Sequence, residues 1–528
     1  MITFSTREKF NDLLRSLIDQ FIAGCAIVFR LILFFRMKTY SIRQALLRKE
    51  YGITDSTAIH LYDGFTRSSI ETKFRELGSS ATYAYTSGST REPKKLAYDQ
   101  KRLRKTRLVF VDAFFRYLAQ FSVHRTLFIF SSIEPDNSLT TLLLKEEKLP
   151  PYLSGLQAPH RLQNHPAIRN EVRTHGDTAV RFWMIAISNP AVLYATNPST
   201  IAIFLHELHE NWTASRRLIA DYIYHQEEFR HLRKLHKRMA SIGSQKRLEK
   251  IANALEPLPV EELFPALRAV SCWDGGYVQP FLEQIRKYLP ESRYKHLPMY
   301  SMSTETIETV AGSIENPVFL PLAPGVHYEF IEEGKKDLPT NIVRPHELVV
   351  ETLYSMIVTD AYGLHRYQTE DLFQCAGMVS GIPDLRFVRR RNLSYSFTGE
   401  KLTSDQLKIA YRDAEDSFPD LRLHGFLICF PSRSEFEMLP CYRLLLVKTS
   451  SKDFRNGSAV ASMVEKKLSI INEEFKVKIE TRRLGRMVFE AVPIRDFVRR
   501  VSNPNDSTTL GSQFKFLPLY PKLWEALR

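Results

Sequence analysis

A run of hydroxyl, glycine and lysine residues at 85–95 has the composition of a loop that holds phosphate. It reads Tyr-Thr-Ser-Gly-Ser-Thr-Arg-Glu-Pro-Lys-Lys. Hydroxyls and exposed backbone amides can donate hydrogen bonds to phosphate oxygens, and lysine supplies positive charge. The spacing is not that of a Walker A loop, which needs Gly-x-x-x-x-Gly-Lys before Ser or Thr. By composition alone, an ordinary turn rich in Ser, Gly and Thr is equally compatible with this segment.

A carboxylate at Glu305 stands among hydroxyl residues, in the run Met-Tyr-Ser-Met-Ser-Thr-Glu-Thr at 299–306. A carboxylate near phosphates is useful if it holds Mg²⁺. Taken alone, such a glutamate is more often a cap or a surface residue. A third motif, Trp-Asp-Gly-Gly at 273–276, ends a strand-like run, and such turns admit a nucleotide ring close to the backbone in α/β sheets.

The elements that must position these residues follow from local patterns. Short aromatic and β-branched runs predict strands at 81–85, 126–130 and 267–273, and apolar residues at helical spacing predict a helix at 103–121. Strands at 327–331 and 347–352 are expected to pair. Asn197-Pro-Ser-Thr precedes an apolar helix, which the serine or threonine is expected to cap.

The order of motifs resembles that of the auxin-responsive acyl acid amido synthetases, a branch of the adenylate-forming superfamily. Nine positions of the loop at 85–95, counting the free one, fit the superfamily pattern Tyr-Thr-Ser-Gly-Ser/Thr-Thr-Gly-x-Pro-Lys-Gly, with Arg91 and Lys95 in place of glycine. Gly-Leu-x-Arg-Tyr at 363–367, Asp371, Phe-Val-x-Arg at 387–390 and Gly-Glu-Lys-Leu at 399–402 follow in the family's order.

The resemblance implies a role for each matching residue. The loop would cradle the phosphates of ATP, the glycine turn and Tyr367 would lie beside adenine, and Asp371 would accept both ribose hydroxyls, although the preceding residue is Glu370 where the family has glycine. Lys515, in an element similar to the family's closing Gln-x-Lys-x-Pro, would reach the reacting carboxylate. The implied site residues are catalytic Lys515, Glu305 and Arg390; ATP- or AMP-binding Ser87, Gly88, Ser89, Thr90, Lys94, Gly275, Gly276, Thr304, Tyr367 and Asp371; acyl-substrate Ser199 and Thr200; and Glu305 as the metal ligand.

The fold class that the resemblance implies is α/β. A large N-terminal adenylate-forming domain at 1–398, with mixed β-sheets flanked by helices, would bind ATP and the acyl acid. A small mobile C-terminal α/β domain at 399–528 would close over the site and rotate near 396–402. Within this domain, strand-like runs are expected at 423–430, 442–448, 477–481 and 487–491, with a helix at 459–475.

Composition is compatible with such an enzyme and leaves other classes open. The chain has 528 residues, is 44% hydrophobic and carries a net charge of +14, which suits acidic partners such as nucleotides, nucleic acid or anionic membranes. The cations are spread along the chain, so we expect no nucleic-acid partner. The five cysteines have no paired short spacing, which favours a reducing cytoplasm.

An apolar helix is expected at 17–37, around the run at 21–35. This run is too short, and too interrupted by Arg30, to span a bilayer. The favoured interpretation is a buried or partner-covered helix; the alternative is peripheral contact with the inner membrane surface. His-Glu-Leu-His-Glu at 206–210 lacks the His-Glu-x-x-His spacing of zinc proteins, so a solvated helix face is expected there.

These expectations describe an ATP- and Mg²⁺-dependent ligase that adenylates a carboxylic acid and transfers the acyl group to an amine such as an amino acid. Two alternatives stay open at this point. The same adenylate could pass to the thiol of coenzyme A or a carrier protein, or the chain could be a non-catalytic membrane- or nucleic-acid-binding protein that kept the fold.

Overall fold

The chain divides into two compact units. This computed structural model describes residues 4–85, 94–118, 127–130, 139–144, 162–163, 165–275, 278–298, 300–312, 317–391, 394–397, 400, 402–433, 439–450, 452–501 and 516–527. Among these, the larger unit contains the residues up to Arg389 and the smaller unit those from Arg390 onwards. The expected domain boundary between 398 and 399 stays a prediction.

A parallel four-stranded sheet in the order β3-β4-β5-β6 forms one layer of the large unit. All three strand pairs are parallel, and the central strands are fully buried, as in sheets that are covered by helices on both faces. The strands expected near 126–130 and 267–273 are thereby confirmed in shorter form. The four strands are Leu127–Ile129, Val192–Tyr194, Ala269–Ser271 and Lys295–Leu297.

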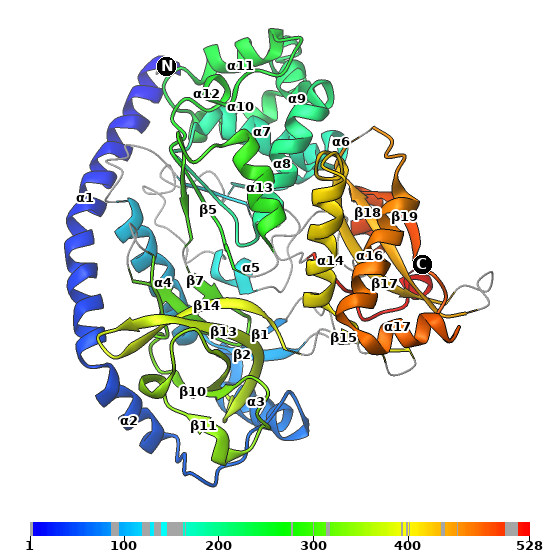
Figure 1. Cartoon of the computed structure of the whole chain (residues 1–528). Helices are drawn as coiled ribbons and strands as arrows, with labels where there is room; N and C mark the ends of the chain where they lie inside the picture. The colour runs from blue at the N-terminus through cyan, green and yellow to red at the C-terminus, as the bar shows by residue number, and fades with distance from the viewer. Residues whose placement is uncertain are drawn as a thin grey trace. The chain divides into compact units, whose positions relative to one another are not determined.

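Helices connect these parallel strands and supply most of the surrounding core (Figure 1). Helix α7 is almost entirely buried because its run Val180–Ile187 is apolar apart from Arg181. The helices are α5 Leu139–Leu144, α6 Pro166–His175, α7 Asp177–Ser188, α8 Pro198–Glu210, α9 Trp212–Tyr224, α10 Arg230–Met239, α11 Ser244–Asn253, α12 Val260–Leu263 and α13 Gln279–Tyr288.

An antiparallel five-stranded sheet in the order β11-β10-β12-β13-β14 forms the second layer of the large unit. Strand β10 pairs with β12, so the expected pairing with residues 347–352 is wrong. Residues Pro345–Glu347 form a 3-10 turn instead, and Glu351 has a positive φ of 65°, which breaks an extended run. The strands are β10 His327–Glu332, β11 Ile342–Val343, β12 Leu353–Thr359, β13 Tyr367–Val379 and β14 Ile382–Arg390.

Two smaller sheets and four helices complete the large unit. Strand β1 begins one residue after the expected start, and helix α4 covers most of the expected helix at 103–121. Asp63 caps α3 by accepting a hydrogen bond from Thr66 N at 2.9 Å. The elements are α1 Phe4–Lys38, α2 Tyr40–Glu50, α3 Gly64–Leu77, β1 Thr82–Tyr85, β2 Lys95–Tyr98, α4 Gln100–Leu118, β7 Tyr300–Met302, β8 Ile307–Ala311 and β9 Phe319–Leu320.

Helix α1 leaves an apolar face exposed, so the part of residues 21–35 whose side chains are described is not buried within the chain. The other half of that interpretation, coverage by a partner, stays a prediction. Leu33 is buried, but neighbouring large apolar side chains on α1 and α2 are more than a third exposed. None of the helices in the described ranges has the length and apolar character that a bilayer span requires. The exposed residues, here called the apolar stripe, are Leu13, Leu17, Ile27, Val28, Leu31, Ile32, Phe34, Phe35, Ile42 and Leu46.

The small unit is a three-stranded sheet, β17-β18-β19, packed with helices. Strand β18 is antiparallel to β17 and parallel to β19. Residues 518–520 lie along the other edge of β17, where Cys429 N donates to Pro518 O at 2.9 Å and Tyr520 N donates to Cys429 O at 3.0 Å. Its elements are β15 Ser394–Tyr395, β16 Leu402–Thr403, α14 Ser404–Ser417, α15 Leu421–His424, β17 Gly425–Ser432, β18 Cys441–Lys448, α16 Gly457–Ile471, α17 Glu473–Glu480, β19 Val488–Pro493 and α18 Ile494–Val501.

Most sequence-based expectations for the small unit are confirmed, with one error. The expected strand at 477–481 lies in and just after helix α17, which Asn472 caps by accepting from Phe475 N at 2.9 Å. Four cysteines whose side chains the structure describes are buried thiols, as expected for a chain without a disulfide framework. They are Cys272 and Cys375 in the large unit and Cys429 and Cys441 in the small unit.

Candidate active site

Three of the residues assigned to the site from sequence meet in the large unit. Lys94 Nζ lies 2.8 Å from Glu305 Oε1 and donates to the Tyr367 hydroxyl at 2.6 Å. Lys94 directly precedes β2, Glu305 lies in the turn between β7 and β8, and Tyr367 begins β13. All three side chains are buried. A lysine and a glutamate 211 positions apart in the sequence therefore form one buried ion pair beside a phenol.

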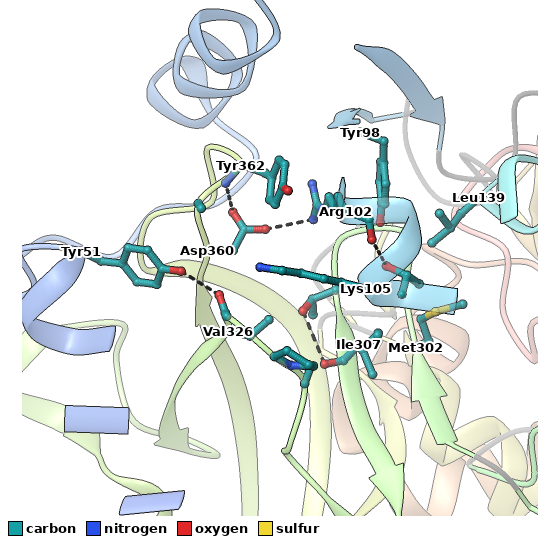
Figure 2. Close-up of a pocket in the computed structure, with 16 residues that line it drawn as sticks. Tyr51, Tyr98, Arg102, Lys105, Leu139, Met302, Ile307, Val326, Asp360 and Tyr362 are labelled. Carbon is teal, nitrogen blue, oxygen red and sulfur yellow. Dashed lines mark hydrogen bonds and ion pairs between the residues drawn. The ribbon is translucent and has the colours of Figure 1, made fainter. Parts of the chain in front are cut away.

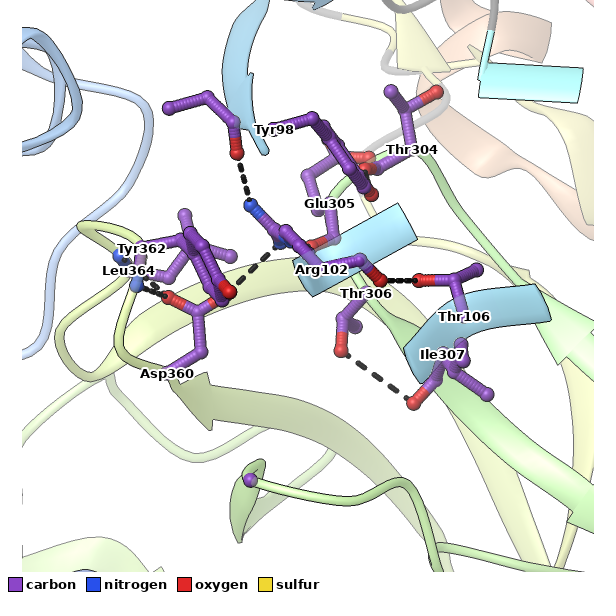
Figure 3. A network of polar contacts seen from close by, with 12 residues as sticks. Tyr98, Arg102, Thr106, Thr304, Glu305, Thr306, Ile307, Asp360, Tyr362 and Leu364 are labelled. Carbon is purple, nitrogen blue, oxygen red and sulfur yellow. Dashed lines mark hydrogen bonds and ion pairs between the residues drawn. The ribbon is translucent and has the colours of Figure 1, made fainter. Parts of the chain in front are cut away.

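Two side chains that the sequence analysis did not identify hold the backbone of the turn that carries Glu305. The Arg102 guanidinium donates to the Glu305 carbonyl at 2.8 Å and pairs with Asp360 at 2.9 Å, and the Tyr98 hydroxyl donates to the Thr304 carbonyl at 2.8 Å (Figure 3). Arg102 also lies over the Tyr98 ring, 4.2 Å from its centroid. Because these contacts fix the backbone, the Glu305 carboxylate has a defined position.

These contacts could not be read from local sequence. Arg102 lies on a helix with several other cations, and nothing in its immediate neighbours distinguishes it from Lys101 or Arg104. Its partners, Asp360 and the Glu305 carbonyl, are distant in the sequence.

Asp371 is presented by a bulge in β13. Ser355 on β12 is paired with Leu372 and Ile357 with Gln368, so one residue of β12 faces the three residues 369–371. The bulge is closed by hydrogen bonds from Thr369 Oγ1 to Met356 O at 2.9 Å and from Asp371 N to Thr369 Oγ1 at 3.2 Å. Bulges commonly redirect a side chain beside an active site.

Glu370 has a left-handed backbone conformation that is unusual for a non-glycine residue. Its φ is +65°, in the left-handed region that glycine tolerates best. The turn before Asp371 therefore has a backbone geometry that favours glycine, although a glutamate occupies it.

The two motifs assigned to substrate and adenine lie on adjacent loops at one edge of the parallel sheet. Strand β4 leads into 195–200 and β5 leads into 272–275, and Trp273 N donates to Thr196 O at 3.2 Å. Ligands of open α/β sheets commonly bind at this carboxyl edge. Ser199 and Thr200 are both buried at the start of α8.

The cap of α8 differs from the expected one. Asn197, not the serine or threonine, is the N-cap, and its Oδ1 accepts from Ser199 N at 3.0 Å. The serine and threonine hydroxyls are therefore not needed to cap the helix.

Gly275 lies where a side chain would not fit. A Cβ at this position would come within 2.9 Å of Trp273 Nε1 and 3.1 Å of Phe387 Cβ. The Trp273 and Phe387 rings are 4.9 Å apart, so the glycine turn packs against β14, the strand that carries the Phe-Val-x-Arg motif. Two motifs that are more than 100 residues apart in the sequence are thus adjacent.

The remaining assigned residues divide into two groups. Thr304 directly precedes Glu305, and Arg390 is the last residue of β14. Outside the described residues lie Ser87, Gly88, Ser89, Thr90, Gly276 and Lys515.

The donor set around Glu305 fits a magnesium ion only if a substrate supplies further oxygens. Within the described ranges, no group of three His, Cys, Asp or Glu side chains is arranged to hold a metal. One carboxylate and the Thr304 hydroxyl would be the protein ligands, which agrees with the habit of Mg²⁺ to bind one or two carboxylates together with phosphate oxygens and water.

Most of the segment His206–Glu210 is packed against neighbouring elements, although Glu210 is exposed. Glu207 is buried and accepts a hydrogen bond from Thr178 Oγ1, while His209 lies against Tyr288 of α13 with ring centroids 4.5 Å apart. The expectation of a solvated face is therefore wrong. These histidines contribute to the contact between α8 and α13.

Comparison with known proteins identifies the family. Residues 79–294 match the N-terminal domain of the GH3 family and residues 319–390 match its central domain, which together make up more than half of the chain. The chain therefore belongs to the GH3 family. The matched ranges include Lys94 and Tyr367, whereas Glu305 and its flanking strands β7 and β8 lie between them.

Similar proteins include two curated plant enzymes. Jasmonoyl--L-amino acid synthetase JAR4 of Nicotiana attenuata is 29% identical over 176 residues, which are 31% of this chain and 29% of that protein. Indole-3-acetic acid-amido synthetase GH3.4 of Arabidopsis thaliana is 25% identical over 184 residues, 32% of this chain and 30% of that protein. The match thus spans less than a third of the length of either relative.

A solved structure shows the same fold over most of the chain. The AtGH3.15 acyl acid amido synthetase in complex with 2,4-DB superposes with a TM-score of 0.63 at 15% identity, covering 87% of this chain and 84% of that one. The expected mixed α/β fold with a large and a small unit is confirmed.

Proposed function

We propose that the protein is an ATP-dependent ligase that joins a carboxylic acid to an amine, with an amino acid as the preferred acceptor. The observation that carries this proposal is the buried cluster of Lys94, Glu305 and Tyr367 in a chain of the GH3 family. Two opposite charges at the base of a phosphate-binding loop suit a reaction between two anions. The bulge that presents Asp371 supports a ribose site on the same strand as Tyr367.

In the first step of the proposed reaction, a carboxylate oxygen attacks the α-phosphorus of ATP. The bond from that phosphorus to the bridging oxygen breaks, and pyrophosphate leaves. Lys94, Arg390 and Lys515 would stabilise the charge that builds up on the phosphate oxygens, which is the main catalytic contribution in such transfers. Glu305 and Thr304 would hold Mg²⁺, which would neutralise phosphate charge when bound.

In the second step, an amine nitrogen attacks the carbonyl carbon of the acyl adenylate and AMP leaves. The nitrogen then loses a proton. The mixed anhydride reacts readily with water, so we propose that the small domain at 399–528 closes over it and turns at 396–402 between the two steps. Ser199 and Thr200 would form part of the wall around the acid.

Release of pyrophosphate that depends on an added acid tests the first step. With a panel of carboxylic acids, the natural sequence should release pyrophosphate, and Asp371→Ala should lower the rate by about 100-fold or more, because ATP loses its ribose contact. Asp55→Ala is the matched control, since Asp55 is 93% exposed and pairs only with Arg48 among the described contacts. Near-normal release by Asp371→Ala would refute the site.

The acceptor of the acyl group can be identified in a separate experiment. Amino acids and coenzyme A would each be added to the adenylate, and the products weighed by mass spectrometry. An amide supports the proposal, whereas a thioester would make the protein an acyl-thioester ligase with the same first step. Absence of pyrophosphate release with every acid would favour a non-catalytic protein.

We further propose that the protein binds peripherally to an anionic membrane, at the inner surface facing the cytoplasm. The apolar stripe of α1 and α2 supports this, since Ile27 and Leu31, Val28 and Ile32, and Ile42 and Leu46 are each four positions apart and share a helix face. Residues 20–49 contain no Asp or Glu. The cations that would meet acidic lipid headgroups are Arg30, Arg36, Lys38, Arg43 and Lys49, whereas Arg48 is engaged by Asp55.

Sedimentation with lipid vesicles tests the membrane proposal. The protein should bind vesicles that contain phosphatidylglycerol more strongly than pure phosphatidylcholine vesicles, and added salt should weaken binding. Leu31→Ser combined with Phe35→Ser should abolish it, while Ile470→Ser, an exposed apolar residue of the small unit, should not. Equal binding by the double variant, or dimerisation through the stripe without lipid binding, would contradict the proposal.

A further inference from the structure

A pocket in the large unit contains none of the residues assigned to ATP or to the acid. It lies beside the first turns of α4, between the β7–β8 hairpin, the segment that precedes β10 and the loop between β12 and β13 (Figure 2). Residues from six separate stretches of sequence converge on it. Those used below are Tyr51, Arg102, Lys105, Thr106, Ile307 and Asp360.

The two cations of the pocket, Arg102 and Lys105, differ in whether a carboxylate balances their charge. Arg102 donates to Asp360 at 2.9 Å, to the Ala97 carbonyl at 2.7 Å and to the Glu305 carbonyl at 2.8 Å. The second oxygen of Asp360 accepts from the backbone amides of Tyr362 and Leu364 at 2.7 and 3.2 Å. Both oxygens of the only carboxylate among the lining residues are therefore already engaged.

Lys105 supplies a positive charge that this arrangement leaves unmatched. Its Nζ lies 3.6 Å from the point where a Cβ on Gly325 would be, so its ammonium reaches the wall opposite α4. Lys105 is partly buried, and in the described part of the chain no carboxylate oxygen lies within 4.0 Å of its Nζ. A partly desolvated ammonium without a counter-ion costs free energy, which an anion in the pocket would recover.

The hydroxyl groups near Lys105 are already used as donors. Tyr51 donates to the Gly325 carbonyl at 2.8 Å, and Thr106 donates to the Arg102 carbonyl at 3.0 Å. Burial, with the nearby carboxylates of Asp360 and Glu50, raises the pKa of Tyr51 to about 12, so the phenol keeps its proton. An anion would thus find its donors mainly on the Lys105 ammonium.

The charge and walls of the pocket favour a carboxylate over a phosphate. Phosphate carries close to two negative charges at neutral pH and needs several donors, whereas one ammonium balances a single charge. The hydroxyls of Tyr98, Thr306 and Tyr362, which also line the pocket, donate to protein oxygens of their own. Much of the remaining wall is apolar and suits a short hydrocarbon. It includes Leu139, Met302, Ile307, Ala323 and Val326.

We propose that this pocket binds a small monocarboxylate, with its carboxylate on Lys105 Nζ and its hydrocarbon part against Ile307, Ala323 and Val326. The site is distinct from the proposed acyl site at Ser199 and Thr200. Because Arg102 lines the pocket and also holds the Glu305 carbonyl, the bound acid steadies the turn that carries Glu305. A simple organic acid would in this way stabilise the geometry of the candidate active site without reacting.

Calorimetric titration of the full chain with sodium propionate, in the absence of nucleotide, tests the proposal. Binding should saturate with the natural sequence, weaken by about tenfold or more in Lys105→Gln and persist in Lys105→Arg. Lys101→Gln is the matched control, since Lys101 is an exposed cation one turn away on the same helix. Lack of saturation by the natural sequence, or equal affinity in Lys105→Gln, would overturn the proposal.

Two further measurements locate the ligand and define its class. Hydrogen exchange should slow on propionate addition in 99–107, 300–309 and 360–364, and protection confined to 195–203 would instead place the acid in the proposed acyl site and contradict this one. Phosphate or chloride binding as tightly as propionate would overturn the assignment to a carboxylate. These readouts need no ATP turnover, so they can fail or succeed independently of the proposed ligase activity.

Discussion

At the scale of single residues, Glu370 occupies a backbone conformation that favours glycine. Its backbone has a φ of +65° inside the bulge that presents Asp371, and the residue is buried. A side chain in this region costs about 1–2 kcal/mol relative to glycine. The bulge therefore contains a local strain directly beside the proposed ribose ligand.

Replacing Glu370 by Gly and by Ala measures this strain. Both variants lose the same side-chain contacts, so their difference reports the backbone alone. Glu370→Gly should be more stable than Glu370→Ala by about 1 kcal/mol, as measured by urea unfolding.

The control lies on the same strand at an ordinary conformation. Ala376→Gly should be less stable than the natural sequence by about 0.5–1 kcal/mol, because glycine loses more entropy on folding. Equal stability of the two Glu370 variants would contradict the strain.

At the scale of elements, a buried ion pair joins two strands of the five-stranded sheet. Arg366, which immediately precedes β13, donates to both oxygens of Glu329 on β10 at 2.8 and 2.7 Å, across the intervening β12. Burial opposes ionisation of Glu329, but His327 and Arg366 outweigh it and lower the pKa of Glu329 to about 2. Arg366 also donates to the Thr57 carbonyl at 2.6 Å, which attaches the segment after α2.

Glu329→Gln should destabilise the protein by about 3–5 kcal/mol, because the Arg366 charge stays buried without its partner. The natural pair contributes fully above the unfolded pKa, near 4.5, and its contribution is lost as the pH falls from there towards 2. The variant should therefore lose less stability than the natural sequence between these pH values in thermal unfolding.

Glu332→Gln is the control on the same strand. Glu332 pairs with Lys335 at 2.7 Å near the surface, and its loss should change stability by less than about 1 kcal/mol. Similar losses of unfolding free energy in both variants would show that the buried pair stabilises the fold no more than the surface pair does.

Local sequence predicted helices and strands correctly where the apolar spacing and the capping residue indicate the same element. The strands near 85, 128 and 270 and the helix after residue 100 are confirmed because their apolar spacing is unambiguous. Residues 477–481 were assigned wrongly because Val477 and Ile479 favour a strand, whereas the Asn472 cap and the acidic first turn of α17 favour a helix. The strand that pairs with β10 was also predicted wrongly. Val349 and Val350 favour a strand by residue type, but both are exposed and precede β12, the strand that does pair with β10.

For the site, sequence order identified residues that the fold brings together, such as Lys94 with Glu305 and Tyr367. It could not identify Arg102 or Asp360, since their roles arise from contacts between distant segments. Whether Asp371 and Arg390 act on ATP stays a prediction.

At the scale of the whole molecule, the two units have separate hydrophobic cores, and each contains two buried thiols. Burial raises the pKa of Cys272 and Cys429, which makes both thiols poor nucleophiles in the folded state. Their alkylation therefore requires opening of the unit that contains them.

We expect the two units to unfold at different urea concentrations. Mass mapping after brief alkylation should show Cys272 and Cys375 reacting together, and Cys429 and Cys441 reacting together at another midpoint. Samples alkylated after full denaturation provide the reference for complete labelling. One shared midpoint for all four thiols would show instead that the chain unfolds as a single cooperative body.

The backbone contacts between Cys429 and residues 518–520 have a consequence for synthesis of the chain. Without this segment, β17 would present unsatisfied amides and carbonyls along its outer side, which is a template for aggregation. The outer edge of β17 therefore stays open to pairing with other chains until residue 520 has left the ribosome. A frameshift or premature stop near 516 would yield a polypeptide prone to self-association and degradation, even though nearly every helix and strand would already have been translated.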